Sequence, residues 1–259
     1  MKMRTLILGL AILLNSASFT HGKEEWKEYK RQHFIVYYKA APQDFVQSVE
    51  QAAEEYYSEI TTNLGFTRYK SWSWDERARI YIYDNSDDYV NAGQQAGWSH
   101  GAASPTDKVI RTFPMAHGFF DSILPHELGH IIFREFIGFN TVIPLWFEEG
   151  IAMYQEKAKR WGAHQAVKEA MKEKKFMPLN DLTHVRLDSR THTDLVNLFY
   201  AESASIVYFL MTEFGQYRFV RFCERLKKGY GFESALAYVY VRFKTIESLN
   251  KEWERYLEK

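Results

Sequence analysis

The sequence predicts an α+β protein with a small sheet in its first part and a mostly helical second part. Segments in which apolar and polar residues alternate, as in half-buried strands, lie before about residue 118. From residue 119 onward apolar residues recur every three or four positions, which is typical of helices. The motif His126-Glu127-Leu128-Gly129-His130 falls just after this change of pattern. We therefore expect the functional site where the two parts meet.

Three strands and two helices are expected in the first part. The strands are residues 33–38, 77–83 and 108–113, and we place the last of them at the edge of the sheet. The helices run from Pro42 to about Asn63 and across residues 87–95. A loop that contains Gly and Ser, residues 97–107, leads into the edge strand. These elements suffice for one small, half-covered sheet.

The second part is expected to be a set of helices with one irregular segment, 176–193, beside the cleft. The expected helices are 119–137, Pro144 to about Arg160, 162–175, 194–214, 216–229, 231–242 and 245–258. Cys223 lies within one of these helical patterns and has no second cysteine to pair with. An unpaired cysteine commonly packs as a small apolar residue, so we expect it in the core.

The motif from His126 to His130 has the spacing of a catalytic metal site. Histidines four residues apart lie on the same face of a helix, so His126 and His130 can bind one metal ion. Glu127 lies between them, where it can accept a proton from a metal-activated water. The alternative is a helix with two partly exposed histidines around a solvated glutamate. The surrounding helix is strongly apolar, and burying these groups without a partner would be costly, which favours a metal.

A third ligand is expected downstream of the two histidines. A three-histidine site of the metzincin type would need Gly at position 133 and His at position 136, and both residues are Phe. A carboxylate on the next helix is the remaining option, and the two adjacent glutamates Glu148 and Glu149 offer one. Neighbouring helical residues point about 100° apart, so only one of the two can face the metal.

The spacing from His130 to Glu149, with Glu149 in the context Trp146-x-x-Glu149-Gly150-x-Ala152, resembles the gluzincin metallopeptidases. The likeness is to small peptidase-MA-like domains and, more distantly, to M1 aminopeptidases. It implies a thermolysin-like zincin fold, Zn²⁺ bound by His126, His130 and Glu149, and Glu127 as general base. It also implies that an extended substrate pairs with the edge strand. Glu148 would then be a neighbouring carboxylate.

The same resemblance extends to Tyr200 and leaves two departures. In the segment Phe199–Val207, Tyr200 matches the tyrosine that stabilises the oxyanion in the M1 relatives, although packing against its helix is an alternative. The glycine-rich motif that holds a substrate amino terminus is not visible, so aminopeptidase specificity is not implied. The thermolysin-type arrangement has an acidic residue four positions after the ligand glutamate, but this chain has Met153 at that position. The hydrogen-bond partner of one histidine is therefore unassigned.

The N-terminal residues indicate where in or outside the cell the protein is expected. A basic start, an apolar run through Leu14 and small or polar residues up to Gly22 have the layout of a signal peptide. The apolar run is shorter than the roughly 20 residues that span a bilayer, so a retained interfacial anchor is the alternative. We expect residues 1–22 to be the signal and residues 23–259 the catalytic domain, with its sheet up to about residue 118. The protein would then be periplasmic or secreted, without a stable membrane span.

Composition and histidine positions add the remaining expectations. The 33 basic and 33 acidic residues cancel, so no strong field would draw the protein to nucleic acid or to an anionic membrane. Among histidines in expected loops, His192 is a weak candidate for assisting the transition state because it precedes the Tyr200 segment. The predicted function is hydrolysis of a peptide or protein substrate with Zn²⁺. A zinc-retaining binding or scaffold protein, and a zinc hydrolase of a non-peptide bond, are the alternatives.

Overall fold

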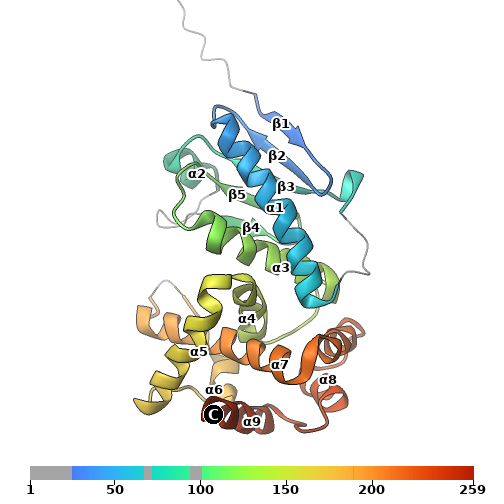
Figure 1. The fold of residues 1–259 in the computed structure, drawn as a ribbon, viewed down its shortest axis with the longest axis vertical. Helices are drawn as coiled ribbons and strands as arrows, with labels where there is room; N and C mark the ends of the chain where they lie inside the picture. Colours follow the sequence, from blue (N-terminus) through green and yellow to red (C-terminus); the bar gives the residue numbers. More distant parts are fainter. Residues whose placement is uncertain (1–24, 67–71, 94–100, 189) are drawn as a thin grey trace, which may run out of the picture.

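The structure, a computed structural model, describes residues 25–66, 72–93, 101–188 and 190–259. The expected signal peptide, residues 1–22, and the first part of the expected loop 97–107 lie outside these residues. The described part of the chain forms an upper lobe that contains a sheet and a lower lobe of helices (Figure 1). The strands are β1 (Lys27–Lys30), β2 (Phe34–Tyr38), β3 (Ala78–Ile82), β4 (Ala102–Ser104) and β5 (Val109–Thr112).

The five strands are arranged in the order β1-β2-β3-β5-β4. The central strands β2, β3 and β5 are parallel, and β1 and β4 add to them in the antiparallel direction. Val36 lies opposite Ile80, and Ile80 lies opposite Ile110, so all three side chains enter the buried face of the sheet. The alternation that predicted two of these strands thus also sets their register.

The expected edge strand was placed wrongly. Residues 109–112 form β5, which pairs with β3 on one side and β4 on the other and is therefore interior. The edge on this side is β4, which was expected to be part of a loop. Its three residues are too few to show an alternating pattern, and its pairing depends on the turn at 105–108 that folds it back onto β5. The opposite edge, β1, was not predicted either.

Two helices belong to the upper lobe before the motif is reached. Helix α1 (Gln43–Leu64) buries the apolar stripe that predicted it, and it ends at Gly65, whose φ of 77° only glycine adopts readily. Helix α2 (Ser86–Gly93) is short. Figure 1 shows α1 crossing one face of the sheet and continuing down past α3 (Leu124–Ile137). α3 is preceded by a π-helical turn, Phe119–Ile123.

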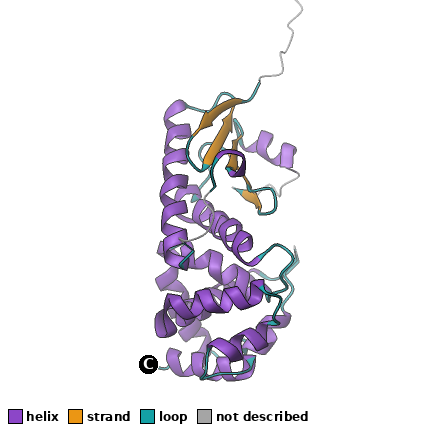
Figure 2. Ribbon diagram, turned by 90° about the vertical axis from the view of Figure 1, so that its right-hand side faces the viewer, coloured by secondary structure: helices purple, strands orange, loops and turns teal. Residues whose placement is uncertain are grey.

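The lower lobe consists of packed helices, seen from the side in Figure 2. They are α4 (Leu145–Gln155), α5 (Lys157–Lys172), α6 (Leu179–His184), α7 (Thr193–Lys227), α8 (Phe232–Val239) and α9 (Ile246–Leu257). Two expectations are corrected. The helix expected up to Arg160 breaks at Glu156, which has an extended ψ of 91°, and α5 begins directly afterwards. The irregular segment 176–193 contains α6, which follows Pro178.

The central helix of this lobe is α7, which packs on both α4 and α5. It joins the two expected helices 194–214 and 216–229, and Gly215 has non-helical angles at the kink between them. Among the described helices, α7 is the one whose length and composition would allow it to cross a membrane. However, 61% of its apolar stretch is buried inside the protein. Cys223 is fully buried on it, as expected. α7 therefore has the burial of a core helix.

Candidate metal centre

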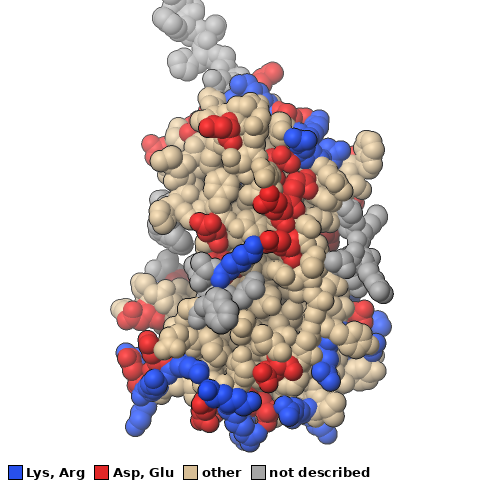
Figure 3. Space-filling model, viewed as in Figure 1, with Lys and Arg blue, Asp and Glu red and all other residues tan. Residues whose placement is uncertain are grey.

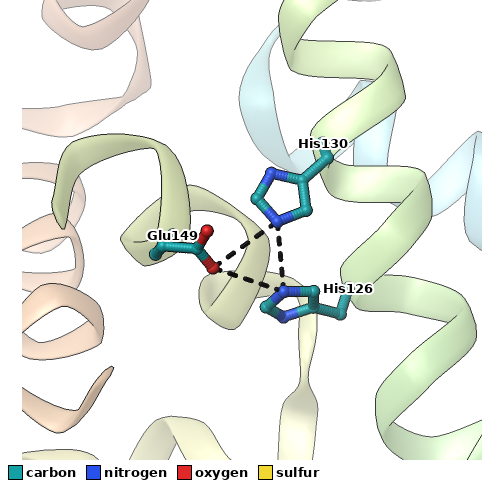
Figure 4. Close-up of side chains that lie close together, drawn as sticks. All are labelled: His126, His130 and Glu149. Atoms are coloured by element: carbon teal, nitrogen blue, oxygen red, sulfur yellow. Dashed lines mark hydrogen bonds and ion pairs between the residues drawn. The ribbon is translucent and has the colours of Figure 1, made fainter. Parts of the chain in front are cut away.

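Helix α3 places the two histidines of the motif side by side. Its apolar residues are buried on the faces that contact α1 and α4, while His126 and His130 lie one turn apart on the face toward α4. The Nε2 atoms of the two rings are 3.1 Å apart and point to the same space (Figure 4). The local sequence therefore suffices to bring these two nitrogens together.

Glu149 completes the group from α4. Its Oε2 atom is 3.5 Å from Nε2 of His126 and 3.6 Å from Nε2 of His130 (Figure 4). One donor atom from each of the three residues lies within 4.8 Å of the others. The three side chains that were expected to bind zinc are thus brought to one point by two helices that are adjacent in the chain.

Two glycines explain how closely the helices approach. A Cβ atom on Gly129 would lie 3.1 Å from the Cα of Ala152, so α3 and α4 nearly touch at this crossing. A Cβ atom on Gly150 would lie 2.2 Å from the carbonyl oxygen of Ser203 on α7, which leaves no room for any side chain. The Glu-Gly-x-Ala sequence therefore fits α4 between α3 and α7, with Glu149 toward the histidines.

The charges around these ligands are strongly coupled. Burial would raise the pKa of Glu149, but its interactions with the imidazoles of His126 and His130 outweigh burial and lower the pKa to about 2. Burial would likewise lower the pKa of His126, whereas the carboxylates of Glu149 and Glu156 raise it to about 9. Without a metal the group thus favours a positive charge between these carboxylates.

Glu127 and Tyr200 lie in the same electrostatic environment. Burial raises the pKa of Glu127, and the positive charge of the two histidines opposes this shift. Burial, together with the carboxylates of Glu149 and Glu127, also raises the pKa of Tyr200 to about 12. Tyr200 lies on α7 and packs edge-on against Phe199. Its phenol is therefore a neutral hydrogen-bond donor that is electrostatically coupled to the expected ligands.

Glu156 contacts one of the expected ligands, His126, and was not among the residues expected at the site. It lies at the break between α4 and α5, where it is 1% exposed, and its Oε1 accepts a hydrogen bond of 2.9 Å from Nδ1 of His126. Its other oxygen accepts a hydrogen bond from the Ser122 hydroxyl, one turn before His126. Position 156 is seven residues after Glu149, about two turns along the same helical face. That spacing is the signal in the sequence that points to Glu156.

Glu148, the other glutamate of the pair, points to the second histidine. Its Oε1 is 3.8 Å from Nδ1 of His130 and accepts a hydrogen bond of 2.6 Å from Nε of Arg134. Arg134 also binds the second carboxylate oxygen and the carbonyl of Thr141. Glu148 is thus a neighbouring carboxylate, as the resemblance implied, and is held in place by a bidentate arginine.

The remaining histidine hypothesis has a different structural explanation. His192 caps the N-terminus of α7 by accepting a hydrogen bond from the backbone of Asp194, and its side chain is 80% exposed. His184 similarly contacts the carbonyl of Asn180 on α6. Within the described residues, no hydrogen bond or ion pair links His192 to the ligand group, so helix capping accounts for this residue.

The donor set fits a zinc ion. Two imidazole nitrogens and one carboxylate oxygen are a set found in catalytic zinc sites, which keep one further position for water or substrate. Glu127, Glu148, Glu149 and Glu156 surround the histidines, and Arg134 is the cation that pairs with one of them. A divalent cation would offset this excess of negative charge, and both imidazoles have a carboxylate beside the nitrogen that faces away from the ligand group.

Comparison with known proteins agrees with this fold. The sequence model of the Peptidase MA superfamily matches residues 72–259. No curated protein sequence matches the chain. The solved structure of native yeast LTA4 hydrolase is similar, with a TM-score of 0.53 and 17% identity. The alignment covers 91% of this chain and 39% of the yeast chain, so this chain spans well under half of that protein. The shared fold confirms the expected α+β zincin architecture.

Proposed function

Because the chain belongs to the Peptidase MA superfamily, we propose that it is a zinc-dependent metallopeptidase that hydrolyses peptide bonds. The observation that carries this proposal is the convergence of His126, His130 and Glu149 beside the buried carboxylate of Glu127. A structural zinc site has no need of such a base and is normally closed by a fourth protein ligand. Secretion or transport to the periplasm, argued from the signal-like residues 1–22, is part of the proposal.

The residues of the site divide the proposed reaction among them. Bound zinc would polarise the attacking water and the substrate carbonyl. Glu127 accepts the proton of the water and returns it to the leaving amine, and its raised pKa suits a group that must both take and release a proton. Tyr200 donates a hydrogen bond to the negative charge that develops on the carbonyl oxygen. Glu156 holds the ring of His126 so that Nε2 faces the ligand group.

Substrate would bind as an extended chain along β4, the edge strand that the structure places next to α3. Contacts between α3 and β4 bring this edge to the motif helix, and a Cβ atom on Gly101 would touch the side chain of Ile123. An edge strand presents free backbone groups to which a peptide can add. This position replaces the one that was expected for residues 108–113.

The decisive experiment compares the wild-type chain with the Glu127→Gln variant on a peptide library. We expect chelation to abolish cleavage by the wild type and zinc to restore it. Glu127→Gln should still bind zinc with near wild-type affinity but lose at least about 100-fold in turnover, because the base is gone while the ligands remain. Full activity of a clean Glu127→Gln preparation would overturn the mechanism.

A second candidate is a zinc hydrolase that acts on a non-peptide bond. It is favoured by the likeness to the yeast protein, whose name describes a hydrolase of LTA4. The same general base would serve either substrate class. A panel of ester substrates, run beside the peptide library with the same Glu127→Gln control, separates the two. If only the non-peptide substrates are hydrolysed, and a chelator stops that reaction, the peptidase proposal is rejected in favour of this candidate.

A further inference from the structure

A basic region lies at the end of the molecule opposite to the sheet. The chain as a whole has no net charge, yet residues 214–244 contain seven basic residues and two acidic residues, a net charge of +5. The basic residues are Arg218, Arg221, Arg225, Lys227, Lys228, Arg242 and Lys244. This region covers the second half of α7, α8 and the segment after it, far from β1 (Figure 1). Carboxylates instead gather over α1 in the upper lobe (Figure 3).

Several of these cations share one face of α7 with an exposed tyrosine. Tyr217, Arg221, Arg225 and Lys228 follow one another at intervals of four, four and three residues, which keeps them within about 80° around the helix. Arg221 has one acidic neighbour, Glu224, at 3.9 Å. The stripe therefore keeps a clear excess of positive charge toward solvent.

Arg225 is held in a fixed position on this stripe by two tyrosines. Its guanidinium carbon lies 3.5 Å from the ring centre of Tyr230 and 3.9 Å from that of Tyr238. The chain reverses at Gly229, whose φ is 82°, and this turn folds Tyr230 back over Arg225, while Tyr238 approaches from α8. Within the described residues Arg225 has no hydrogen-bond acceptor or carboxylate partner, and its buried Nε is unpaired. The guanidinium is thus ordered without an anion.

The same surface exposes side chains that prefer a boundary between water and lipid. Tyr217 is 75% exposed, and Tyr238, whose ring contacts Arg225, is 58% exposed. Tyrosine combines an apolar ring with a polar hydroxyl and is enriched at the level of lipid headgroups. Aromatic and basic side chains on one face are a combination found on proteins that lie on anionic membranes.

We propose that this face, made by Tyr217, Arg221, Arg225, Lys228 and Tyr238, docks on a membrane of anionic phospholipid. The stacked guanidinium of Arg225 would bind a headgroup phosphate through paired hydrogen bonds, a geometry for which arginine is suited. Neighbouring cations add long-range attraction to the charged surface. This docking would be peripheral, with α7 remaining in the protein core, and it is independent of the metal centre and of the proposed peptidase function.

The test uses the full chain and lipid vesicles in a sedimentation assay. We expect binding to vesicles of phosphatidylglycerol and phosphatidylcholine, little binding to pure phosphatidylcholine, and loss of binding as salt is raised. The triple variant Arg221→Gln, Arg225→Gln, Lys228→Gln should bind at least about tenfold more weakly. A control triple variant, Lys27→Gln, Lys30→Gln, Lys39→Gln, removes the same charge near the sheet and should bind like the wild type.

Two further arms keep the proposal open to contradiction. If the basic-face triple variant does not fold, as judged by circular dichroism, the single exposed substitution Arg221→Gln and the variant Tyr238→Ser are measured in its place, and each should weaken binding. Equal binding by the two triple variants would show that only net charge matters and would overturn the docking face. Binding to single-stranded RNA without binding to anionic vesicles would overturn it as well.

Discussion

Ser122, His126 and Glu156 form a chain of hydrogen bonds beside the three expected metal ligands. Because Nδ1 of His126 donates to Glu156, the proton of the neutral ring is held there, and Nε2 keeps its lone pair toward Glu149 and His130. The Ser122 hydroxyl in turn fixes the carboxylate. The position four residues after Glu149 is occupied by Met153, which packs against Tyr200 and Ala204 instead. The acidic partner is thus one helical turn further along.

Changing Glu156 should therefore weaken zinc binding without removing a ligand. We expect Glu156→Ala to lower zinc affinity by about 10- to 100-fold and Glu156→Gln to lower it less, since the amide oxygen can still accept from Nδ1. Competition with a chromophoric chelator measures this directly. Glu173→Gln, which changes an exposed acid near the end of α5, is the matched control. Unchanged affinity in a folded Glu156→Ala protein would show that the carboxylate has no influence on the metal site.

Helix α4 is the element on which the site depends, since it contributes Glu148 and Glu149 and ends at Glu156. It is held between α3 and α7, and Gly150 is the point at which its backbone meets that of α7. Protein interiors tolerate little extra volume because they are close-packed. A side chain at position 150 must push the two helices apart, and the neighbouring ligand Glu149 would move with α4.

The variant Gly150→Ala tests this packing. We expect it to lower the free energy of unfolding by ~1–3 kcal/mol or more, because its Cβ would overlap the Ser203 carbonyl, and to weaken zinc binding as well. Gly162→Ala on α5 is the control, since nothing lies within 4 Å of its Cβ position and alanine favours a helix. Chemical denaturation of both proteins measures the difference. Two variants of equal stability would contradict the role assigned to Gly150.

At the scale of the whole molecule, stability should depend on a carboxyl group buried in the lower lobe. Glu202 on α7 is fully buried; one oxygen accepts a hydrogen bond from the backbone of Met177 and the other has no partner in the described structure. Burial raises its pKa to about 8 from an ordinary value of 4.5. The folded protein therefore keeps this proton over a pH range in which the unfolded chain has lost it.

The free energy of unfolding should consequently fall as the pH rises from about 4.5 to about 8. For this one group the slope is at most roughly 1.4 kcal/mol per pH unit, and below pH 4.5 its effect disappears because both states are protonated. Glu202→Gln should flatten the profile across that window, whereas Glu213→Gln, at an exposed position on the same helix, should not. Denaturation of the chelated protein at several pH values measures this. Parallel profiles for wild type and Glu202→Gln would refute the assignment.

Local spacing alone was enough to predict much of this protein. The i and i+4 positions of His126 and His130 must share a face of any helix, and alternation in β2 and β3 must place one side of each strand in the core. Those relations depend on backbone geometry within a few residues. The helical second part, the buried Cys223 and the kinked pair of helices in α7 followed from the same patterns.

Other features were decided only by contacts between distant segments. Whether Glu148 or Glu149 faces the histidines depends on how α4 rotates against α3, which Gly129 and Gly150 set by close approach. Glu156 contacts His126, 30 residues earlier in the chain, because the helix breaks at Glu156. Strand β4 forms the edge of the sheet because the chain folds back onto β5. Periodicity describes one element at a time. The sequence by itself therefore determined which residue types the expected ligands are and which helices carry them. Packing between the elements decided which side chains contact one another.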